Sequence, residues 1–288
     1  MTYPDPARSV NELFDSISAS ARLDEGRLTI TDEAEFRAAG VQAAVWSATF
    51  SESAEVIEAA RWLVWEASQA LGCPSASIHE LYMARGRGEI GGFTVPAVNL
   101  RTQVFDMAGA MCRAADEIDA GAIIFELARS EQEYTYQRPA EYITSVLAGC
   151  IAAGWRGPVF VQGDHYQFNA AKYAADPAAT TEAIRRLTSA ALSAGYGNID
   201  IDSSTLVDLS QPTVAEQQRI NYERAAEISA LIREQEDAEL TVSIGGEIGE
   251  VGKDNSTEEE LRAYLDGYLA ALGDGIEPVS KVSVQTGT

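Results

Sequence analysis

The stretch GPVFVQGDHYQFN, residues 157–169, decides what the rest of the chain is expected to be. Residues 158–161 are typical of a buried strand, and this strand ends in Gly163, Asp164 and His165. The chain has only two histidines, so one of them stands beside a carboxylate at the end of an apolar run. Either the imidazole binds a ligand together with that carboxylate, or it only caps the strand, and the neighbouring segments have to decide between these readings.

Six β-rich runs, this one included, alternate with helical patterns. The predicted strands are 93–100, 122–129, 158–165, 198–205, 240–247 and 281–288. The predicted helices are 103–119, 139–153, 177–194, 213–235 and 256–272. Successive strands start about 30–40 residues apart, which is the length of one βα unit. Because the strands read as near-continuous apolar runs, they indicate a parallel sheet covered by helices.

Helix starts carry their own signals. Pro139 and Pro177 fit the first turn of a helix, where the missing N–H removes no hydrogen bond. Ser256 and Glu259 have the spacing of a capping box and predict that the last helix begins there.

The carboxyl ends of the predicted strands collect polar residues, and this favours a closed barrel over an open sheet. These residues are Asn99, Glu126, Asp164 with His165, Asp202 with Ser203, and Glu247. A (β/α)8 (TIM) barrel keeps its chemistry at this end of its strands. No GxGxxG or GxxxxGK[ST] motif follows a strand, so the usual nucleotide-binding versions of an open sheet have no support. We expect an α/β protein with about six βα units of a TIM barrel.

The expected organisation has two parts. Residues 1–77 carry amphipathic helical patterns, with Trp46, Trp62 and Trp65 as packing anchors, and predict an N-terminal helical extension. Residues 78–288 predict the barrel domain, which opens with a helix and a glycine-rich turn. A complete barrel needs two more βα units, so a chain that ends in its sixth strand is expected to be truncated at the C-terminus.

Composition narrows the function classes. The net charge of −23 and the pI near 4.4 disfavour nucleic acid and anionic membrane as partners. A phosphorylated substrate would be repelled as well and would need a local cationic site, either arginines or a metal. Three cysteines without a CxxC pair predict buried thiols in a reducing compartment. Together with the lack of a signal peptide or a long apolar run, this predicts a cytoplasmic protein.

Three segments supply candidate site residues. A bend after Gly163 would turn both Asp164 and His165 toward the barrel mouth, where the imidazole could bind a metal and the carboxylate could move a proton. On the strand 198–205, Asp200 and Asp202 share one face, and two inward acids require a metal or a counter-charge. Asp202 is nearer the carboxyl end, while Asp200 could pair with an arginine deeper in the barrel. In the third segment, Glu247 and Glu250 stand among glycines.

Taken together, these segments resemble the class II, metal-dependent ketose-bisphosphate aldolases, over residues 78–288. FTVPAVNL (93–100) is similar to the PAFN segment of the family's first strand, and VQGDH (161–165) to its Asp-His signature. IDIDSS (199–204) resembles the IDxS strand, and GEIGEVG (246–252) the ELGxxGG segment. The family's next zinc histidine follows in an HGG segment, and this chain ends just before that point.

The resemblance implies specific roles. Asp164 would be the catalytic acid/base, and His165, Asp202 and Glu247 would bind the metal, with Ser243 as an alternative register for Glu247. Asn99 and Ser203 would bind substrate. The expected cofactor is Zn²⁺ or a similar divalent cation, which leaves room for a monovalent cation as well. His79 lies ahead of the barrel and is interpreted as a packing or surface residue, not as a replacement ligand.

The implied reaction is cleavage of fructose or tagatose 1,6-bisphosphate to dihydroxyacetone phosphate and glyceraldehyde 3-phosphate through a zinc-stabilised enediolate. The expected partners are small sugar phosphates and further copies of the chain, as a dimer or larger homo-oligomer. With one of three family histidines present, the 288 residues alone are expected to be inactive. Two alternatives stay open: a non-catalytic companion subunit of a tagatose-bisphosphate aldolase, and another metal-dependent sugar-phosphate barrel enzyme.

Overall fold

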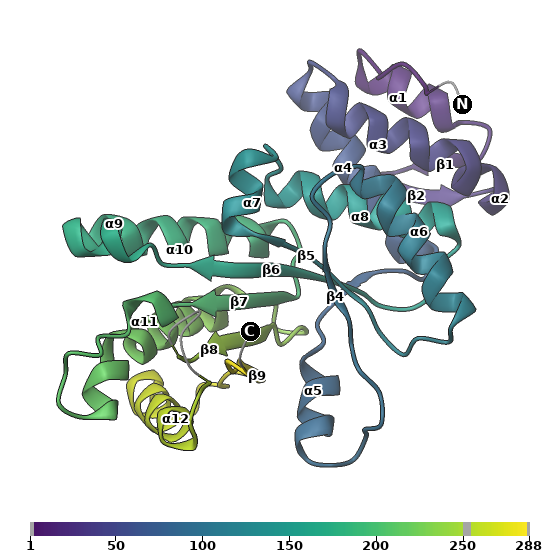
Figure 1. The fold of residues 1–288 in the computed structure, drawn as a ribbon. Coiled ribbons are helices and arrows are strands. Elements are labelled where there is room, and N and C mark those ends of the chain that lie inside the picture. Colours follow the sequence, from purple (N-terminus) through teal and green to yellow (C-terminus); the bar gives the residue numbers. More distant parts are fainter. Residues whose placement is uncertain (1–2, 250–254, 287–288) are drawn as a thin grey trace. The chain divides into compact units, whose positions relative to one another are not determined.

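The computed structural model of the chain describes residues 3–249 and 255–286 (Figure 1). It shows an α/β fold in which helices alternate with the strands of a parallel sheet. The chain divides into two compact units, each described by itself below. Unit 1 comprises Met1–Ala76, Phe93–Leu127 and Glu131–Val161, and unit 2 comprises Ser77–Gly92, Ala128–Ser130 and Gln162–Thr288. The predicted boundary between residues 77 and 78 stays a prediction.

Unit 1 is mainly helical. Its helices are α1 (Val10–Ile17), α2 (Glu33–Glu35), a π-helical turn (Phe36–Gly40), α3 (Val41–Phe50), α4 (Ala54–Ala70), α6 (Val104–Glu117), most of α7 (Arg129–Tyr134) and α8 (Pro139–Ala153). Its strands are β1 (Ala21–Asp24), β2 (Arg27–Ile30), β3 (Ser75–Ala76), β4 (Ala97–Asn99), β5 (Ile124–Ala128) up to Leu127, and the first residues of β6 (Val159–Gln167). Helix α8 is buried along almost its whole length, so it forms the centre of this unit.

Close backbone approach fixes how α8 packs in unit 1. A Cβ added at Gly149 would overlap the carbonyl oxygen of Phe105 and lie 2.9 Å from the Cβ of Ala108 on α6. Glycine at this crossing therefore lets the two helix backbones approach more closely than any side chain would permit. The predicted tryptophan anchors are half-buried: Trp46 stacks on Tyr3, with 4.3 Å between ring centroids.

Unit 2 holds the later βα repeats. Its helices are α5 (His79–Gly86), α9 (Ala170–Ala175), α10 (Pro177–Ser193), a 3₁₀ turn (Ser204–Leu206), α11 (Val214–Gln235) and α12 (Glu258–Leu272). Its strands are most of β6, then β7 (Asn198–Asp202), β8 (Ser243–Glu247) and β9 (Lys281–Ser283). Helix α11 packs against α10 and α12. Among the described residues, no helix combines the length and apolar character needed to cross a membrane.

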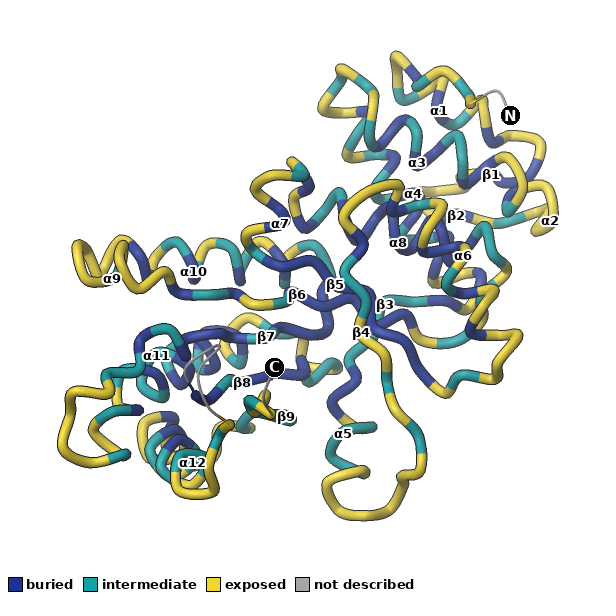
Figure 2. The backbone as a smooth tube through the Cα atoms, in the orientation of Figure 1, coloured by how far each residue is buried: buried dark blue, intermediate teal, exposed yellow. Residues whose placement is uncertain are grey.

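The sheet follows chain order, β4-β5-β6-β7-β8-β9, and every pairing given for it is parallel. Strand β3 pairs with the start of β6. The tube in Figure 2 is dark blue along β5, β7, β8 and the first half of β6, because these strands are buried. Neighbouring strands that run the same way in sequential order bring their carboxyl ends to one edge, as the polar strand ends require.

The structure confirms the predicted sheet, and most of its strands are shorter than predicted. All six predicted strands and all five predicted helices are present, and the proline starts at Pro139 and Pro177 are confirmed. The predicted capping box is wrong by one residue, since Thr257 and Glu260 form it. The antiparallel hairpin β1–β2 was not predicted, although Gly26 and Glu25 adopt the positive φ angles of a tight turn. The three cysteines are buried and free, as predicted.

Candidate functional site

A β-bulge places the two residues that opened the sequence argument. In the pairing of β6 with β7, Gly163 lies opposite Ile199 and Tyr166 opposite Ile201, so Asp164 and His165 together face a single residue. His165 has a φ of 40°, in the left-handed region that non-glycine residues adopt at a cost of about 1 kcal/mol. The predicted bend after Gly163 is therefore present.

The bulge gathers one imidazole and three carboxylates from three neighbouring strands of unit 2. His165 Nδ1 lies 3.2 Å from Asp202 Oδ2 and 3.3 Å from Glu247 Oε2. On the other side of the ring, His165 Nε2 lies 3.6 Å from Asp164 Oδ1. We call these four residues the His165 site. The structure thus brings together all the residues predicted for metal binding and proton transfer.

Asp202 is the buried and tightly held member of the His165 site, with a side chain only 1% exposed. Its Oδ1 accepts hydrogen bonds from the backbone N–H and the hydroxyl of Ser204, at 3.1 and 2.7 Å, and its Oδ2 accepts one from Gln167 Nε2 at 2.5 Å. Burial raises the pKa of Asp202, but hydrogen bonds from His165, Ser204 and Gln167 outweigh it, so the net pKa lies below its usual value. The carboxylate is therefore ionised and fixed in orientation.

His165 is held as a cation when only protein groups surround it. Hydrogen bonding to Asp202, and then to Glu247, raises the pKa of His165 to about 11 against the opposing effect of burial. Counted over its own four residues, the site holds three carboxylates and one imidazolium. This surplus of negative groups favours the binding of a cation.

The donor set fits a divalent metal ion. One ligand atom each from His165, Asp202 and Glu247 can be chosen so that all three lie within 4.8 Å of one another. A zinc ion with bonds of about 2.0–2.2 Å separates tetrahedral ligands by roughly 3.4 Å, close to the distances around Nδ1. Loss of the Nδ1 proton would let this nitrogen and both carboxylates offer lone pairs to the same point. These residues could therefore hold a metal.

Two further predicted positions behave differently. Ser203 is fully buried, and its hydroxyl donates to the carbonyl groups of Asn221 at 2.7 and 2.9 Å. Asn221 in turn donates to the backbone carbonyl of Glu247 at 2.9 Å, so Ser203 supports the strand end of β8. Asn99 lies in unit 1, where its amide donates to Glu131 Oε2 at 2.9 Å, and Arg101 pairs with the same carboxylate. Their predicted roles in substrate binding stay predictions.

The register resolves the alternative for Glu247. Ser243 pairs with Asn198 at the amino end of β8 and exchanges a hydrogen bond with Ser280, whereas Glu247 ends the strand beside His165. His79 is buried and lies 3.6 Å from Glu277, which confirms its interpretation as a packing residue. Glu250 lies outside the described residues.

A second polar group lies one step toward the amino ends of the same strands. Asp200, Gly245 and Lys281 occupy paired positions on β7, β8 and β9. Lys281 Nζ lies 2.8 Å from Asp200 Oδ1 and also contacts Gln162 Oε1, and Gln162 Nε2 donates to Asp200 Oδ2 at 2.9 Å. A Cβ at Gly245 would overlap Asp200, so glycine leaves the space that this pair occupies. We call these residues the Lys281 layer.

The Lys281 layer corrects one expectation. Asp200 pairs with a lysine, not with an arginine. Lys281 begins β9, which is separated from β7 by β8, and its aliphatic side chain passes over Gly245 of β8 to reach Asp200. The ammonium also lies 5.6 Å from the centre of the Tyr82 ring. In this layer the ammonium of Lys281 and the carboxylate of Asp200 neutralise each other.

Sequence reasoning missed Gln167, Ser204 and Asn221. Gln167 follows His165 by two residues, and Ser204 follows Asp202 by two, so both stand where polar residues extend a strand end. Asn221 lies within α11, and no local pattern distinguishes it from other helical amides.

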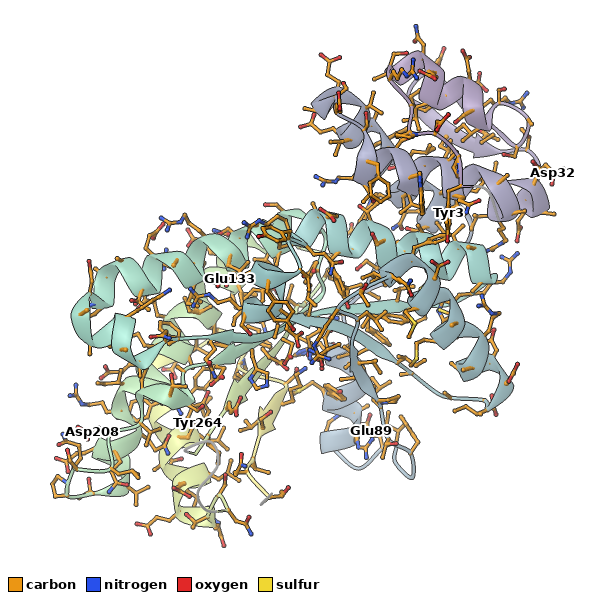
Figure 3. The ribbon with its side chains drawn as sticks, turned by 45° about the horizontal axis from the view of Figure 1, so that its top comes forward. Tyr3, Asp32, Glu89, Glu133, Asp208 and Tyr264 are labelled. Atoms are coloured by element: carbon orange, nitrogen blue, oxygen red, sulfur yellow. The ribbon has the colours of Figure 1, made fainter. Side chains whose placement is uncertain are left out.

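Tyr264 of α12, labelled in Figure 3, is buried behind Gly246 of β8, and burial raises the pKa of its hydroxyl.

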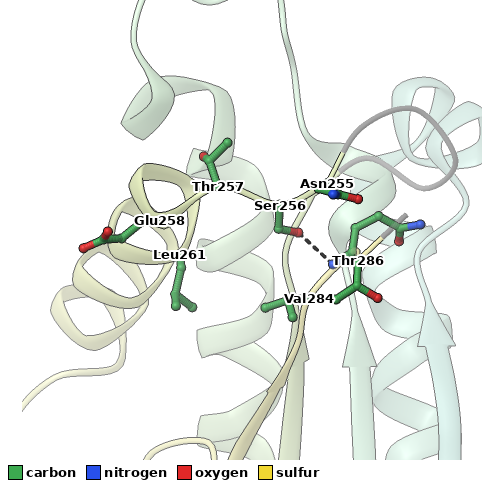
Figure 4. A pocket seen from close by; sticks show the side chains of 8 residues that line it. Asn255, Ser256, Thr257, Glu258, Leu261, Val284 and Thr286 are labelled. Carbon is green, nitrogen blue, oxygen red and sulfur yellow. Dashed lines mark hydrogen bonds between the residues drawn. The ribbon is translucent and has the colours of Figure 1, made fainter. Parts of the chain in front are cut away.

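A small cavity lies where the residues that follow β9 run beside the start of α12 (Figure 4). It has a volume of about 320 Å³ and is lined by residues 255–258, Leu261 and 284–286. Two hydrogen bonds of 2.8 Å join the two sides of the cavity: the Ser256 N–H donates to the Gln285 carbonyl, and the Gln285 N–H donates to the Ser256 hydroxyl. The first turn of α12 carries three glutamates, so this end of the helix does not favour an anion.

Comparisons with known proteins give little further information. No family model and no curated protein matches the chain. Among solved structures it is similar to a probable tagatose 6 phosphate kinase from Sinorhizobium meliloti 1021, at 18% sequence identity and a TM-score of 0.49. The alignment covers 67% of this chain and 49% of that one, so the chain spans about half the length of that structure. A likeness of this degree carries no inference about activity.

Proposed function

We propose that the chain carries the metal and proton-transfer site of a class II ketose-bisphosphate aldolase, built on part of a TIM barrel. The observation that carries the proposal is the position of His165 Nδ1 between Asp202 and Glu247, with Asp164 on the other side of the ring. The sequential parallel strands support the barrel, since polar residues recur at their carboxyl ends and at alternate positions below. Buried, unpaired thiols fit a reducing compartment such as the cytoplasm.

In this proposal the chain's own residues divide the work. Asp202 and Glu247 supply charge and lone pairs, and neutral His165 supplies a nitrogen ligand. Zinc, when bound, polarises the substrate carbonyl as a Lewis acid. Asp164 adjoins the metal ligands without being required as one, so its carboxylate can take the proton from the C4 hydroxyl during cleavage and return it during condensation. Ser204 and Gln167 keep Asp202 in place throughout.

The experiment combines metal analysis with an aldol-cleavage assay. The protein is purified with zinc, and cleavage of fructose and tagatose 1,6-bisphosphate is measured on this chain and on any longer chain that contains it. In a preparation that cleaves a bisphosphate, we expect Asp164→Ala to retain zinc and to lose about 10²–10⁴-fold in turnover, and His165→Ala to lose both. Asp266→Asn, an exposed acid on α12, is the matched control and should change neither.

Two results would contradict the proposal. Turnover that survives Asp164→Ala would remove the assigned proton carrier. A protein that binds no zinc, cobalt or manganese at the His165 site would remove the metal chemistry altogether.

One observation favours a second candidate, the non-catalytic companion subunit. Among the described residues, the His165 site offers a single imidazole, fewer than an aldolase of this class is expected to use. A companion subunit would bind a divalent ion, but neither protein preparation would cleave fructose or tagatose 1,6-bisphosphate. It would instead raise the turnover of a separate catalytic aldolase chain added to it.

A further inference from the structure

A guanidinium group lies beside the His165 site without an acidic partner. Arg129 directly follows β5 and is half-buried, and its Nη1 donates to the backbone carbonyl of Gln167 at 2.6 Å. The side chain of Gln167 is bonded to Asp202 at 2.5 Å, so a single residue connects Arg129 to the metal ligands. This contact lies at the carboxyl end of β6, at the second residue after His165.

Arg129 differs from other arginines of unit 2. Arg224 and Arg233 lie within 2.5 and 2.6 Å of glutamates, and Arg262 within 2.6 Å of another. Among residues 3–249 and 255–286, no carboxylate lies within 4.0 Å of the Arg129 guanidinium, although the chain has 44 acidic residues for 21 lysines and arginines. Its one hydrogen bond to Gln167 fixes the group and leaves further N–H donors for another acceptor.

A cationic group beside the site would favour an anionic ligand. With a divalent ion and a neutral imidazole, the four residues of the His165 site together carry a net charge of about −1. A phosphate dianion approaching this site meets repulsion there and from the charge of −23 on the whole chain. A fixed guanidinium offsets the local charge and offers parallel N–H donors that match two phosphate oxygens.

We infer that Arg129 binds a phosphate group at the mouth of the His165 site, held in place by the Gln167 carbonyl. The assignment of that phosphate to a sugar-phosphate substrate rests on the proposed function. The binding of phosphate itself does not, because it depends only on the guanidinium and its anchor. A carboxylate of similar size presents two oxygens but less charge, so phosphate is the preferred class.

The test measures binding and turnover separately. Inorganic phosphate is titrated calorimetrically into the wild-type protein, with and without zinc, and into Arg129→Gln and Arg129→Lys. We expect Arg129→Gln to bind phosphate about 10- to 100-fold more weakly and Arg129→Lys to fall between them, because lysine keeps the charge without the fork. Zinc content should be unchanged in both. Arg262→Gln, an exposed arginine of the same unit, is the matched control.

The outcomes separate this inference from the proposed function. If phosphate binds equally well to wild type and Arg129→Gln, the inference is wrong, and binding that requires zinc but not Arg129 assigns the phosphate to the metal instead. If phosphate binding depends on Arg129 while neither bisphosphate is cleaved, the inference stands and the aldolase proposal fails. If cleavage occurs, Arg129→Gln should raise KM for the bisphosphate more than it lowers kcat. Thermal melting shows whether Arg129→Gln folds, and Arg129→Lys gives the same comparison if it does not.

Discussion

The His165 site and the Lys281 layer use the same strands, and nearly the same residue types, for opposite purposes. Each takes an aspartate from β7 and a glutamine from β6: Asp202 with Gln167 in the site, and Asp200 with Gln162 in the layer. In the layer, one ammonium neutralises one carboxylate. In the site, three carboxylates surround one imidazole. The two aspartates therefore share one face of β7 and differ in the balance of charge around them.

The largest effect should separate the two aspartates of β7. Asp202→Asn removes a proposed metal ligand and should weaken zinc binding by more than about 100-fold, beyond the usual effect of losing a supporting residue. Asp200→Asn, the same change two residues earlier, should leave zinc affinity within about threefold. Competition against a chromophoric chelator measures both. Equal losses in the two variants would show that the layers are not distinct.

The next effect concerns stability. Lys281→Met leaves Asp200 without its counter-charge, and breaking a buried pair in this way costs about 3–5 kcal/mol. Both side chains are about one quarter exposed, which reduces the expected loss to about 2 kcal/mol in the free energy of unfolding. Urea denaturation provides the measurement. Zinc affinity should not change. A large loss of zinc binding in this variant would show that Lys281 supports the His165 site, contrary to its assignment to the Lys281 layer.

A smaller effect separates the two glutamines of β6. Gln167→Ala removes the amide that holds Asp202 Oδ2, and loss of a residue that orients a metal ligand lowers affinity by about 10-fold. Gln162→Ala acts only on the Lys281 layer and serves as the matched control. If zinc affinity fell in Gln162→Ala and not in Gln167→Ala, the assignment of the two glutamines would be reversed.

The smallest expected effect is the release of about one proton from His165 when zinc binds. The pKa of His165 is raised to about 11 in the metal-free protein, whereas an unfolded histidine has a pKa of about 6.5. Its ion pairs therefore stabilise the metal-free protein fully below about pH 6.5, and this contribution is lost as the pH rises through about 11. At pH 7.5 the imidazole is still protonated, so zinc binding should release about one proton from it.

Calorimetry in buffers of different ionisation enthalpy counts that proton. His165→Ala provides the control, since it has no imidazole to deprotonate. Zinc binding without proton release at pH 7.5 would mean that a neutral His165 already faces the two carboxylates.

Much of the fold follows from the sequence because its signals are local. The period of apolar residues and the terminal prolines specify each βα unit from within about 40 residues. Hairpin β1–β2 was missed because its strands are only four residues long and largely exposed, so they show little apolar alternation. Its turn at Gly26 was the available signal.

The candidate site was predictable where strand ends alone define it. Asp164, His165, Asp202 and Glu247 all follow from that rule, and the structure brings them together. Which serine donates a hydrogen bond to Asp202 could not be predicted. A 3₁₀ turn begins at Ser204, so the alternation of side chains between the two faces of the strand ends there. The lysine partner of Asp200 depends on a strand 81 positions later in the chain, which no local pattern specifies.

The bulge at residues 164 and 165 has a consequence for anyone who would graft this motif elsewhere. Copying the Gly-Asp-His letters onto a regular strand would send the carboxylate and the imidazole to opposite faces, and one of them would be lost to the surrounding helices. A recipient scaffold must supply one surplus residue relative to its neighbouring strand, together with a small residue before it that admits the ring at position 166. The transferable unit is thus an irregularity in strand pairing, and the amino acids are only its visible part.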